Sequence, residues 1–215
     1  MIKDFSDSNS ILNQFLAEIR NVEVQHDRMR FRRNLERMAE IMGYELSKTL
    51  QYEEQEIITP LGEANMKLPK DEVVLATILR AGLPMHQGLL NYFDNADCAF
   101  VSAYRKHTTD EDFDIQVEYC ASPSLVGKDL IISDPMLATG SSMVQVYEAL
   151  KRYGVPRSLH IVCGIATEEG IALLQKKLPQ STKIWVGAVD DELTAQSYIV
   201  PGLGDAGDLA FGDKV

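Results

Sequence analysis

The chain has 215 residues, of which 45% are hydrophobic and 25% charged, as in an ordinary globular protein, and we expect a single domain spanning residues 1–215. The formal net charge of −11 argues against general nucleic-acid binding and means that any anionic substrate must be held by local cations, dipoles or a metal ion. No apolar run reaches membrane-spanning length, residues 1–5 do not begin a signal peptide, and three widely spaced cysteines are typical of free thiols in a reducing cytoplasm, so we expect a cytoplasmic protein.

The first part of the chain predicts two helices, a hairpin and a buried strand. A first helix should run to about Arg20, and Asp27 should cap a longer one. Residues 53–68 read as a β-hairpin around a Pro-Leu-Gly-Glu turn. The continuous apolar run Val73–Leu79 is typical of a strand covered on both faces, and a helix should follow it.

Four arginines lie close together in the second predicted helix. Their most direct interpretation is a solvated face or a subunit contact, and an anion-binding site is the minority interpretation. These residues are Arg28, Arg30, Arg32 and Arg33.

The second part of the chain alternates apolar runs with helical patterns, which indicates an α/β fold with a parallel sheet. Residues 106–124 are polar and then alternate in hydrophobicity, so we expect a projecting hairpin arm with a mobile tip. The further core strands are expected at residues 96–101, 130–132, 157–164 and 182–189.

One stretch has the order expected of a phosphate site. A short apolar strand, Leu130–Ile132, leads to Asp134 and a proline break, and the small-residue loop Ala138–Ser142 then opens a helix. Helix N-termini offer unpaired N–H groups and a positive dipole to phosphate, while Asp134 at a strand end could hold vicinal sugar hydroxyls. Such residues are also ordinary helix caps that bind nothing. The ordered combination favours the ligand interpretation.

Two arginines follow predicted core strands. Arg80 precedes Ala81-Gly82, and its planar guanidinium suits a pyrophosphate better than a simple surface ion pair, given its apolar approach. Arg105 should end the next strand and open the arm, where it could close over phosphate. A plain surface arginine is an equally good interpretation of Arg105.

The segment Tyr198–Asp208 is rich in glycine near the end of the chain. Its glycines permit a tight loop that presents backbone groups to a flat polar ring, with Asp205 beside it. A flexible tail is the alternative, although Tyr198-Ile199-Val200 favours a docked segment. The four histidines show no metal-ligand spacing.

Three of these stretches resemble, in order and spacing, the motifs of uracil phosphoribosyltransferases. Residues 134–142 resemble the loop for phosphoribosyl diphosphate (PRPP), residues 78–83 resemble the pyrophosphate loop, and residues 198–208 resemble the uracil-recognition segment. The likeness extends from about Arg20 onward. The third motif is the specific one, since it distinguishes uracil enzymes from purine and orotate relatives.

The resemblance implies a phosphoribosyltransferase fold, with a mainly parallel sheet flanked by helices, a projecting hairpin arm and a small hood from the terminal segments. It implies Mg²⁺-assisted conversion of uracil and PRPP to UMP and diphosphate in pyrimidine salvage. It also implies dimers or larger homo-oligomers, and some relatives are activated by a purine nucleotide.

Position by position, the resemblance implies catalytic roles for Arg80, Arg105 and Asp134, and backbone recognition of uracil at Ile199, Gly204, Asp205 and Ala206. Mg²⁺ would be held mainly through PRPP, with no direct protein ligand. The residues implied to bind PRPP are Arg80, Arg105, Asp134, Pro135, Met136, Leu137, Ala138, Thr139, Gly140, Ser141, Ser142 and Asp205.

Three single positions and the arm sequence Lys106–Asp110 depart from the family pattern, and two alternative functions stay open. Ser141 stands where a second glycine is usual, Pro84 where a glycine is common, and Leu209 where a basic residue is common. One alternative is a non-catalytic regulator on this fold that senses PRPP or nucleotides, or binds RNA through the arginine cluster. The other is a phosphoribosyltransferase for another base.

Overall fold

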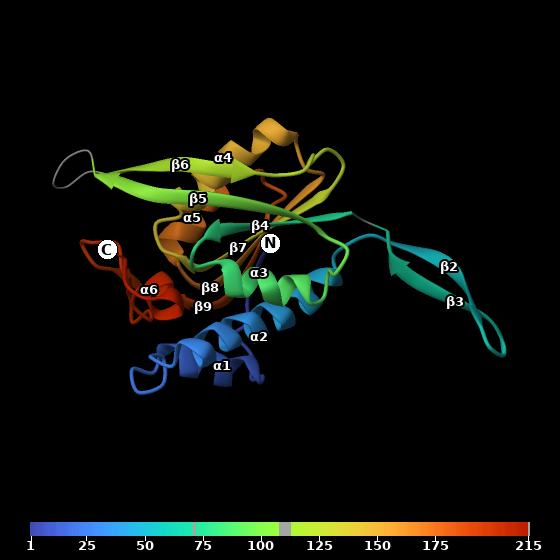
Figure 1. Cartoon of the computed structure of the whole chain (residues 1–215), viewed down its shortest axis with the longest axis horizontal. Helices are drawn as coiled ribbons and strands as arrows, with labels where there is room; N and C mark the ends of the chain where they lie inside the picture. Colours follow the sequence, from blue (N-terminus) through green and yellow to red (C-terminus); the bar gives the residue numbers. More distant parts are fainter. Residues whose placement is uncertain (71, 108–112, 215) are drawn as a thin grey trace.

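The computed structural model describes residues 1–70, 72–107 and 113–214, with the side chains of residues 104–107 and 113–116 left aside. A seven-stranded sheet forms its centre, in the order β1-β9-β8-β7-β4-β5-β6 (Figure 1). Neighbouring strands run parallel except β6, which is antiparallel to β5. The strands are β1 (Ile2–Asp4), β4 (Val73–Leu79), β5 (Asp97–His107), β6 (Phe113–Ala121), β7 (Asp129–Leu137), β8 (Ser158–Thr167) and β9 (Lys183–Asp190). The predicted α/β class with a mainly parallel sheet is confirmed.

Helices cover both faces of the sheet, because central strands alternate their apolar side chains between two cores. Leu75 and Ile131 point into one core with α1, α2, α3 and α6, whereas Val74 and Ile132 point into the other with α4 and α5 (Figure 1). The helices are α1 (Leu12–Arg20), α2 (Arg28–Ser47), α3 (Leu83–Leu90), α4 (Ser141–Leu150), α5 (Glu168–Lys177) and α6 (Ala206–Phe211), with a 3₁₀ turn η1 at Lys151–Tyr153.

Local sequence signals explain where the long helices begin. The Asp27 side chain accepts a hydrogen bond from the N–H of Arg30 at 3.0 Å, as predicted for the cap of α2. Thr167 caps α5 in the same way through the N–H of Gly170. No helix in the described part of the chain is both long and apolar enough to cross a membrane.

The chain forms two β-hairpins, one separate from the main sheet and one at its edge. The first, β2 (Tyr52–Thr59) with β3 (Gly62–Pro69), forms its own two-stranded sheet and stands away from the body (Figure 1). We call it the β2–β3 arm. The second is the arm predicted at residues 106–124: β6 pairs along β5 as the edge of the main sheet, and the outer ends of both strands extend beyond it. Its predicted mobile tip, residues 108–112, lies outside the described residues.

The sequence predicted that Pro135 would end the strand before it, and this prediction is wrong. Strand β7 continues through this proline to Leu137 and pairs again with β8 at Met136, opposite Ile165. Its ladder with β4 ends earlier, at Ser133, so the missing N–H of Pro135 costs nothing on that side. The strand predicted at residues 96–101 is likewise longer, and Arg105 lies within β5 opposite Ile115 rather than at its end.

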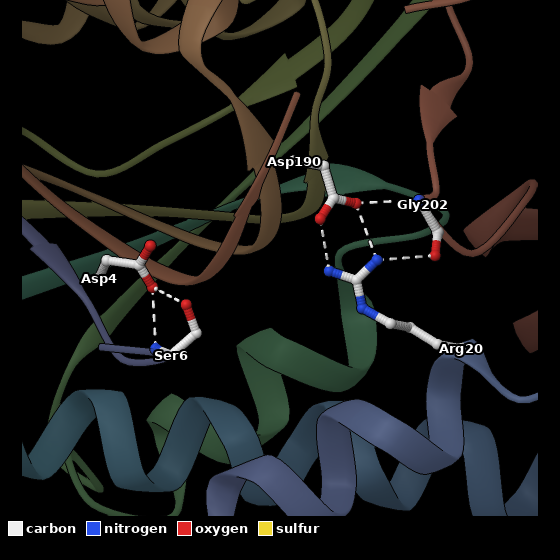
Figure 2. Close-up of polar contacts among 5 residues, drawn as sticks. All are labelled: Asp4, Ser6, Arg20, Asp190 and Gly202. Atoms are coloured by element: carbon white, nitrogen blue, oxygen red, sulfur yellow. Dashed lines mark hydrogen bonds and ion pairs between the residues drawn. The ribbon is translucent and has the colours of Figure 1, made fainter. Parts of the chain in front are cut away.

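The terminal segments form a hood over one end of the sheet, as expected. It comprises α1, the start of α2, the small strand pair β10 (Glu192–Leu193) and β11 (Ile199–Val200), and α6. Arg20 donates to both carboxylate oxygens of Asp190 at 2.7 and 2.8 Å and to the carbonyl of Gly202 at 3.0 Å (Figure 2). The buried Asp190 in turn accepts from the N–H of Gly202 at 2.9 Å. One ion pair therefore fastens the C-terminal segment to the first helix.

Candidate active site

A cavity of about 670 Å³ lies at the carboxyl ends of β4 and β7, under the hood. Three segments that are distant in the sequence line most of it: residues 78–81, the stretch 134–143 and the stretch 196–207. Ser102 and Ala103 of β5 and Lys214 complete the wall. This is the edge at which open α/β sheets bind ligands, and it is where the three motifs meet.

The loop before α4 has the geometry of an anion cradle. Gly140 adopts φ 81°, a left-handed conformation, and a Cβ there would lie 2.8 Å from the carbonyl oxygen of Gly170. Gly140 occupies the capping position of α4 and has no side chain to cap it, while the Thr139 hydroxyl accepts from the N–H of Ser141 at 3.4 Å. The N–H groups that follow Ser141 in the first turn of α4 have no helical partner, so they can bind a ligand at the cavity.

Asp134 lies on the cavity wall where β7 approaches this loop. Its neighbour across the strand pair is the buried Cys163, and burial raises the pKa of Asp134 to about 8. Burial, followed by the nearby Asp134, also raises the pKa of the Cys163 thiol well above its ordinary value. A carboxyl group that stays protonated near neutral pH does not repel a phosphorylated ligand and still offers hydrogen bonds to hydroxyls.

Arg80 lies on the opposite wall of the cavity, on a tight loop after β4. The N–H of Gly82 donates to the carbonyl of Ile78 at 3.0 Å, and the Leu79–Arg80 peptide is cis. The Arg80 guanidinium contacts Asp208 of α6 at 3.2 Å and the carbonyl of Gly212 at 3.2 Å. Arg80 thus joins the pyrophosphate-like loop to the C-terminal segment. The side chain of Arg105 lies outside the described residues.

The C-terminal segment is docked rather than flexible. Gly202 adopts φ 55°, and a Cβ there would lie 2.1 Å from the carbonyl oxygen of Ile199, so the turn requires glycine. Asp205 caps α6 by accepting from the N–H of Asp208 at 3.0 Å. Ile199 and residues 204–206 line the cavity.

Among the predicted site residues whose side chains the structure describes, all but two line this cavity. Pro135 lies behind the wall, with its carbonyl against Gly164. Ser141 lines instead a separate cleft of about 460 Å³ with Glu169 and Lys176. The predicted residues that line the cavity are Arg80, Asp134, Met136, Leu137, Ala138, Thr139, Gly140, Ser142, Ile199, Gly204, Asp205 and Ala206.

Several cavity residues were not predicted. Ser102 and Ala103 carried no signal, because small residues within a strand look like ordinary core. Ser197 adopts φ 62°, which is rare for a residue other than glycine and is visible only in the backbone. Lys214 carries no motif signal, since a single lysine near the end of a chain is common, although it follows the glycine-rich segment closely.

The arginine cluster of α2 is used within the chain. Arg30 pairs with Glu18 at 2.9 Å, Arg33 pairs with Glu36, and Arg32 donates to the carbonyl of Ala210. Arg30 and Arg32 therefore join α2 to α1 and α6, and the acidic partners of Arg30 and Arg33 offset part of the positive charge of the cluster.

The family model for uracil phosphoribosyltransferase matches residues 6–213, nearly the whole chain. The chain belongs to the uracil phosphoribosyltransferase family. A uracil phosphoribosyltransferase of Porphyromonas gingivalis is 54% identical to it over 207 residues, which cover 96% of each chain. The resemblance drawn from the three motifs is therefore confirmed.

Two solved structures place this uracil phosphoribosyltransferase family member among its structural relatives. The AQ2163 protein from Aquifex aeolicus superposes with a TM-score of 0.88 at 30% identity, and the match covers 100% of both chains. A hypoxanthine phosphoribosyltransferase from Staphylococcus aureus gives 0.51 at 17% identity over 86% of this chain and 83% of its own, which shows a shared fold alone.

The departures from the family pattern have local explanations. Pro84 occupies the first turn of α3, where proline is favoured because its missing N–H would have no helical partner. Leu209 is partly buried against the core on α6.

Within the described ranges, no group of three or more His, Cys, Asp or Glu side chains is arranged to hold a metal ion.

Proposed function

We propose that this chain transfers ribose 5-phosphate from PRPP to uracil, giving UMP and diphosphate in pyrimidine salvage. The observation that carries the proposal is the meeting of the phosphate-type loop, the Arg80 loop and the docked segment 196–207 on one cavity. A generic phosphate site would need only the first of these. The docked segment adds the backbone edge that a flat polar base requires.

Each wall of the cavity has a role in this proposal. The 5′-phosphate lies on residues 138–142, at the N-terminus of α4. Asp134 holds the ribose hydroxyls, and Arg80 together with Arg105 binds the diphosphate. Backbone groups of Ile199 and of residues 204–206 recognise the edge of uracil.

The reaction requires stabilisation of developing charge rather than nucleophilic catalysis by the protein. The bond between ribose C1 and the diphosphate oxygen breaks, N1 of uracil bonds to C1, and the N1 proton leaves to solvent. Positive charge builds on the sugar and negative charge on the leaving diphosphate, which Arg80 is placed to stabilise because its fixed guanidinium needs no reorganisation. No protein nucleophile takes part.

Mg²⁺ fits this site as an ion carried by the substrate. Mg²⁺ keeps several waters and commonly binds one or two carboxylates together with phosphates. Asp134 and Asp205 are the carboxyl groups on the wall, and an oxygen of each can accept a hydrogen bond from the waters of the ion. The ion supplies charge neutralisation on the diphosphate when bound.

Turnover with defined substrates tests the function. The protein with Mg²⁺, PRPP and labelled uracil should form labelled UMP, and hypoxanthine or orotate in excess should compete poorly. A pure, folded preparation that converts no pyrimidine base would reject the proposal. Efficient use of hypoxanthine or orotate instead would show a phosphoribosyltransferase for another base. A salt-sensitive RNA complex would support a non-catalytic regulator that binds RNA.

We also propose a homo-oligomer in solution, on the basis of the β2–β3 arm. An isolated two-stranded hairpin is only marginally stable in water, yet this arm exposes Ile58 by 73% and Leu61 completely. A second copy that packs on the arm would cover these side chains. Light scattering should show a dimer or larger species, and Ile58→Ser should shift it toward monomer; a wild-type monomer would contradict the idea.

Three further expectations belong to the same proposal. Residues 1–215 should unfold as a single domain in one calorimetric transition. Turnover should be tested with and without a purine nucleotide, which we propose as an activator. We also propose a cytoplasmic location, which fractionation of the host cell would check.

A further inference from the structure

Lys214 lies at the mouth of the cavity, beyond the end of α6. Its ammonium group is 3.6 Å from a carboxylate oxygen of Asp205, and its side chain is 65% exposed. The backbone just before it is anchored twice, because Gly212 accepts from Arg80 at 3.2 Å and donates to the carbonyl of Asp208 at 2.8 Å. Lys214 is therefore two residues from a fixed point on the cavity wall.

We propose that Lys214 is a substrate-binding residue that contacts the diphosphate of PRPP, an inference that rests on the proposed function. On the described wall of the cavity, the positively charged residues are Arg80 and Lys214, beside the acidic Asp134 and Asp205. The chain as a whole carries −11, so its overall field repels an anionic substrate. Each local cation then matters for holding the diphosphate.

The contacts of the C-terminal segment indicate the diphosphate rather than the base. Arg80, the proposed diphosphate ligand, donates hydrogen bonds to Asp208 and to the carbonyl of Gly212, and Lys214 follows these residues in the chain. The two cations are thus carried on segments that are bonded to each other. In the proposed function the base is recognised instead by backbone groups of Ile199 and of residues 204–206, which need no cation.

Lys214 can leave Asp205 for a phosphate oxygen with little loss of free energy. The pair between Lys214 and Asp205 is 65% and 35% exposed, and exposed pairs contribute little to stability. A phosphate oxygen offers more charge and a stronger hydrogen bond than a solvated carboxylate. Asp205 keeps its hydrogen bond to the N–H of Asp208 after Lys214 leaves, so α6 stays capped.

The test is a kinetic comparison of Lys214→Gln with a matched control. We expect the KM for PRPP to rise by about fivefold, with kcat within about twofold of wild type and the KM for uracil unchanged, as for loss of one exposed charge contact. Lys214→Arg should restore the KM for PRPP. Lys177→Gln, which removes an exposed lysine at the end of α5, changes the net charge equally and should behave as wild type.

Two results would overturn the proposal: equal KM values for PRPP in Lys214→Gln and Lys177→Gln, or a rise confined to the KM for uracil. Failure of the proposed function is a separate outcome, recognised by wild-type protein that makes no UMP. Calorimetric titration of PRPP with Mg²⁺ into wild type and Lys214→Gln decides the role of Lys214 even then, since it requires no turnover.

Discussion

Asp134 should make the substrate-free protein less stable as the pH rises, and Asp134→Asn should remove this effect. Burial raises the pKa of Asp134 from its ordinary 3.8 to about 8. Between these two values the folded protein keeps the proton, whereas the unfolded chain has released it. Because the folded state binds more protons in this window, the free energy of unfolding falls as the pH rises through it, and the loss is complete above about pH 8.

The interval between the two pKa values gives the size of the effect. It is about four pH units (8 − 3.8), which corresponds to about 5 to 6 kcal/mol at ~1.4 kcal/mol per unit. Water that enters the cavity solvates the ionised carboxylate, so we expect about 2 kcal/mol of this to be measured. For a chain of this length, such a change shifts the Tm by about 4 to 8 °C.

Thermal unfolding of wild type and Asp134→Asn across this pH window measures the difference. The Tm of the variant should exceed that of wild type by an amount that grows from about pH 4 and levels off above about pH 8. Asp191→Asn, at an exposed position beside the hood, is the matched control and should follow wild type. A Tm difference that stays constant with pH would refute the reasoning. The variant should also turn over more slowly above about pH 8, because an amide presents one acceptor oxygen to the ribose hydroxyls where the ionised carboxylate presents two.

Two further substitutions test the loop and the hood. Gly140→Ala places a methyl group against the carbonyl of Gly170 at a left-handed φ, so it should destabilise the fold by about 1 to 3 kcal/mol and raise the KM for PRPP; unchanged urea unfolding and kinetics would contradict this. Arg20→Ala leaves the buried Asp190 without its bidentate partner and should cost about 3 kcal/mol in unfolding free energy. It should also raise the KM for uracil through Gly202; a stability loss without that rise would limit Arg20 to a role in folding.

The long elements of the fold could be predicted because their signals are local. The apolar run of β4, the cap residue of α2 and the whole of α5 follow from periodicity and capping chemistry within ten or twenty residues. Two of the site motifs could be predicted as well, since the Arg80 loop and the phosphate-type loop each come at the carboxyl end of a strand of the parallel sheet. The C-terminal segment is indicated instead by its glycines.

The rest depends on contacts that a local pattern does not contain. Strand β1 has three residues and exists through its pairing with β9, so no periodicity could reveal it. Pro135 looked like a break because the sequence does not show where the ladder with β4 ends. The docking of the C-terminal segment depends on Arg20 and Asp190, whose partnership spans most of the chain. Ser141 seemed part of the loop, yet its position at the start of α4 turns it toward α5.

The link between Arg20 and the C-terminal segment has a consequence for biosynthesis. It joins Arg20 to Asp190 and Gly202, residues that are 170 and 182 positions away along the chain (Figure 2). A ribosome therefore exposes the first helix long before its partner has been synthesised, and contacts of such long range form late. Strands β4 to β8 and the phosphate loop are synthesised earlier, whereas β9, its partner β1 and the base-recognition side of the cavity are completed only with the last part of the chain. The residues of the proposed phosphate site are therefore synthesised before those of the proposed uracil site.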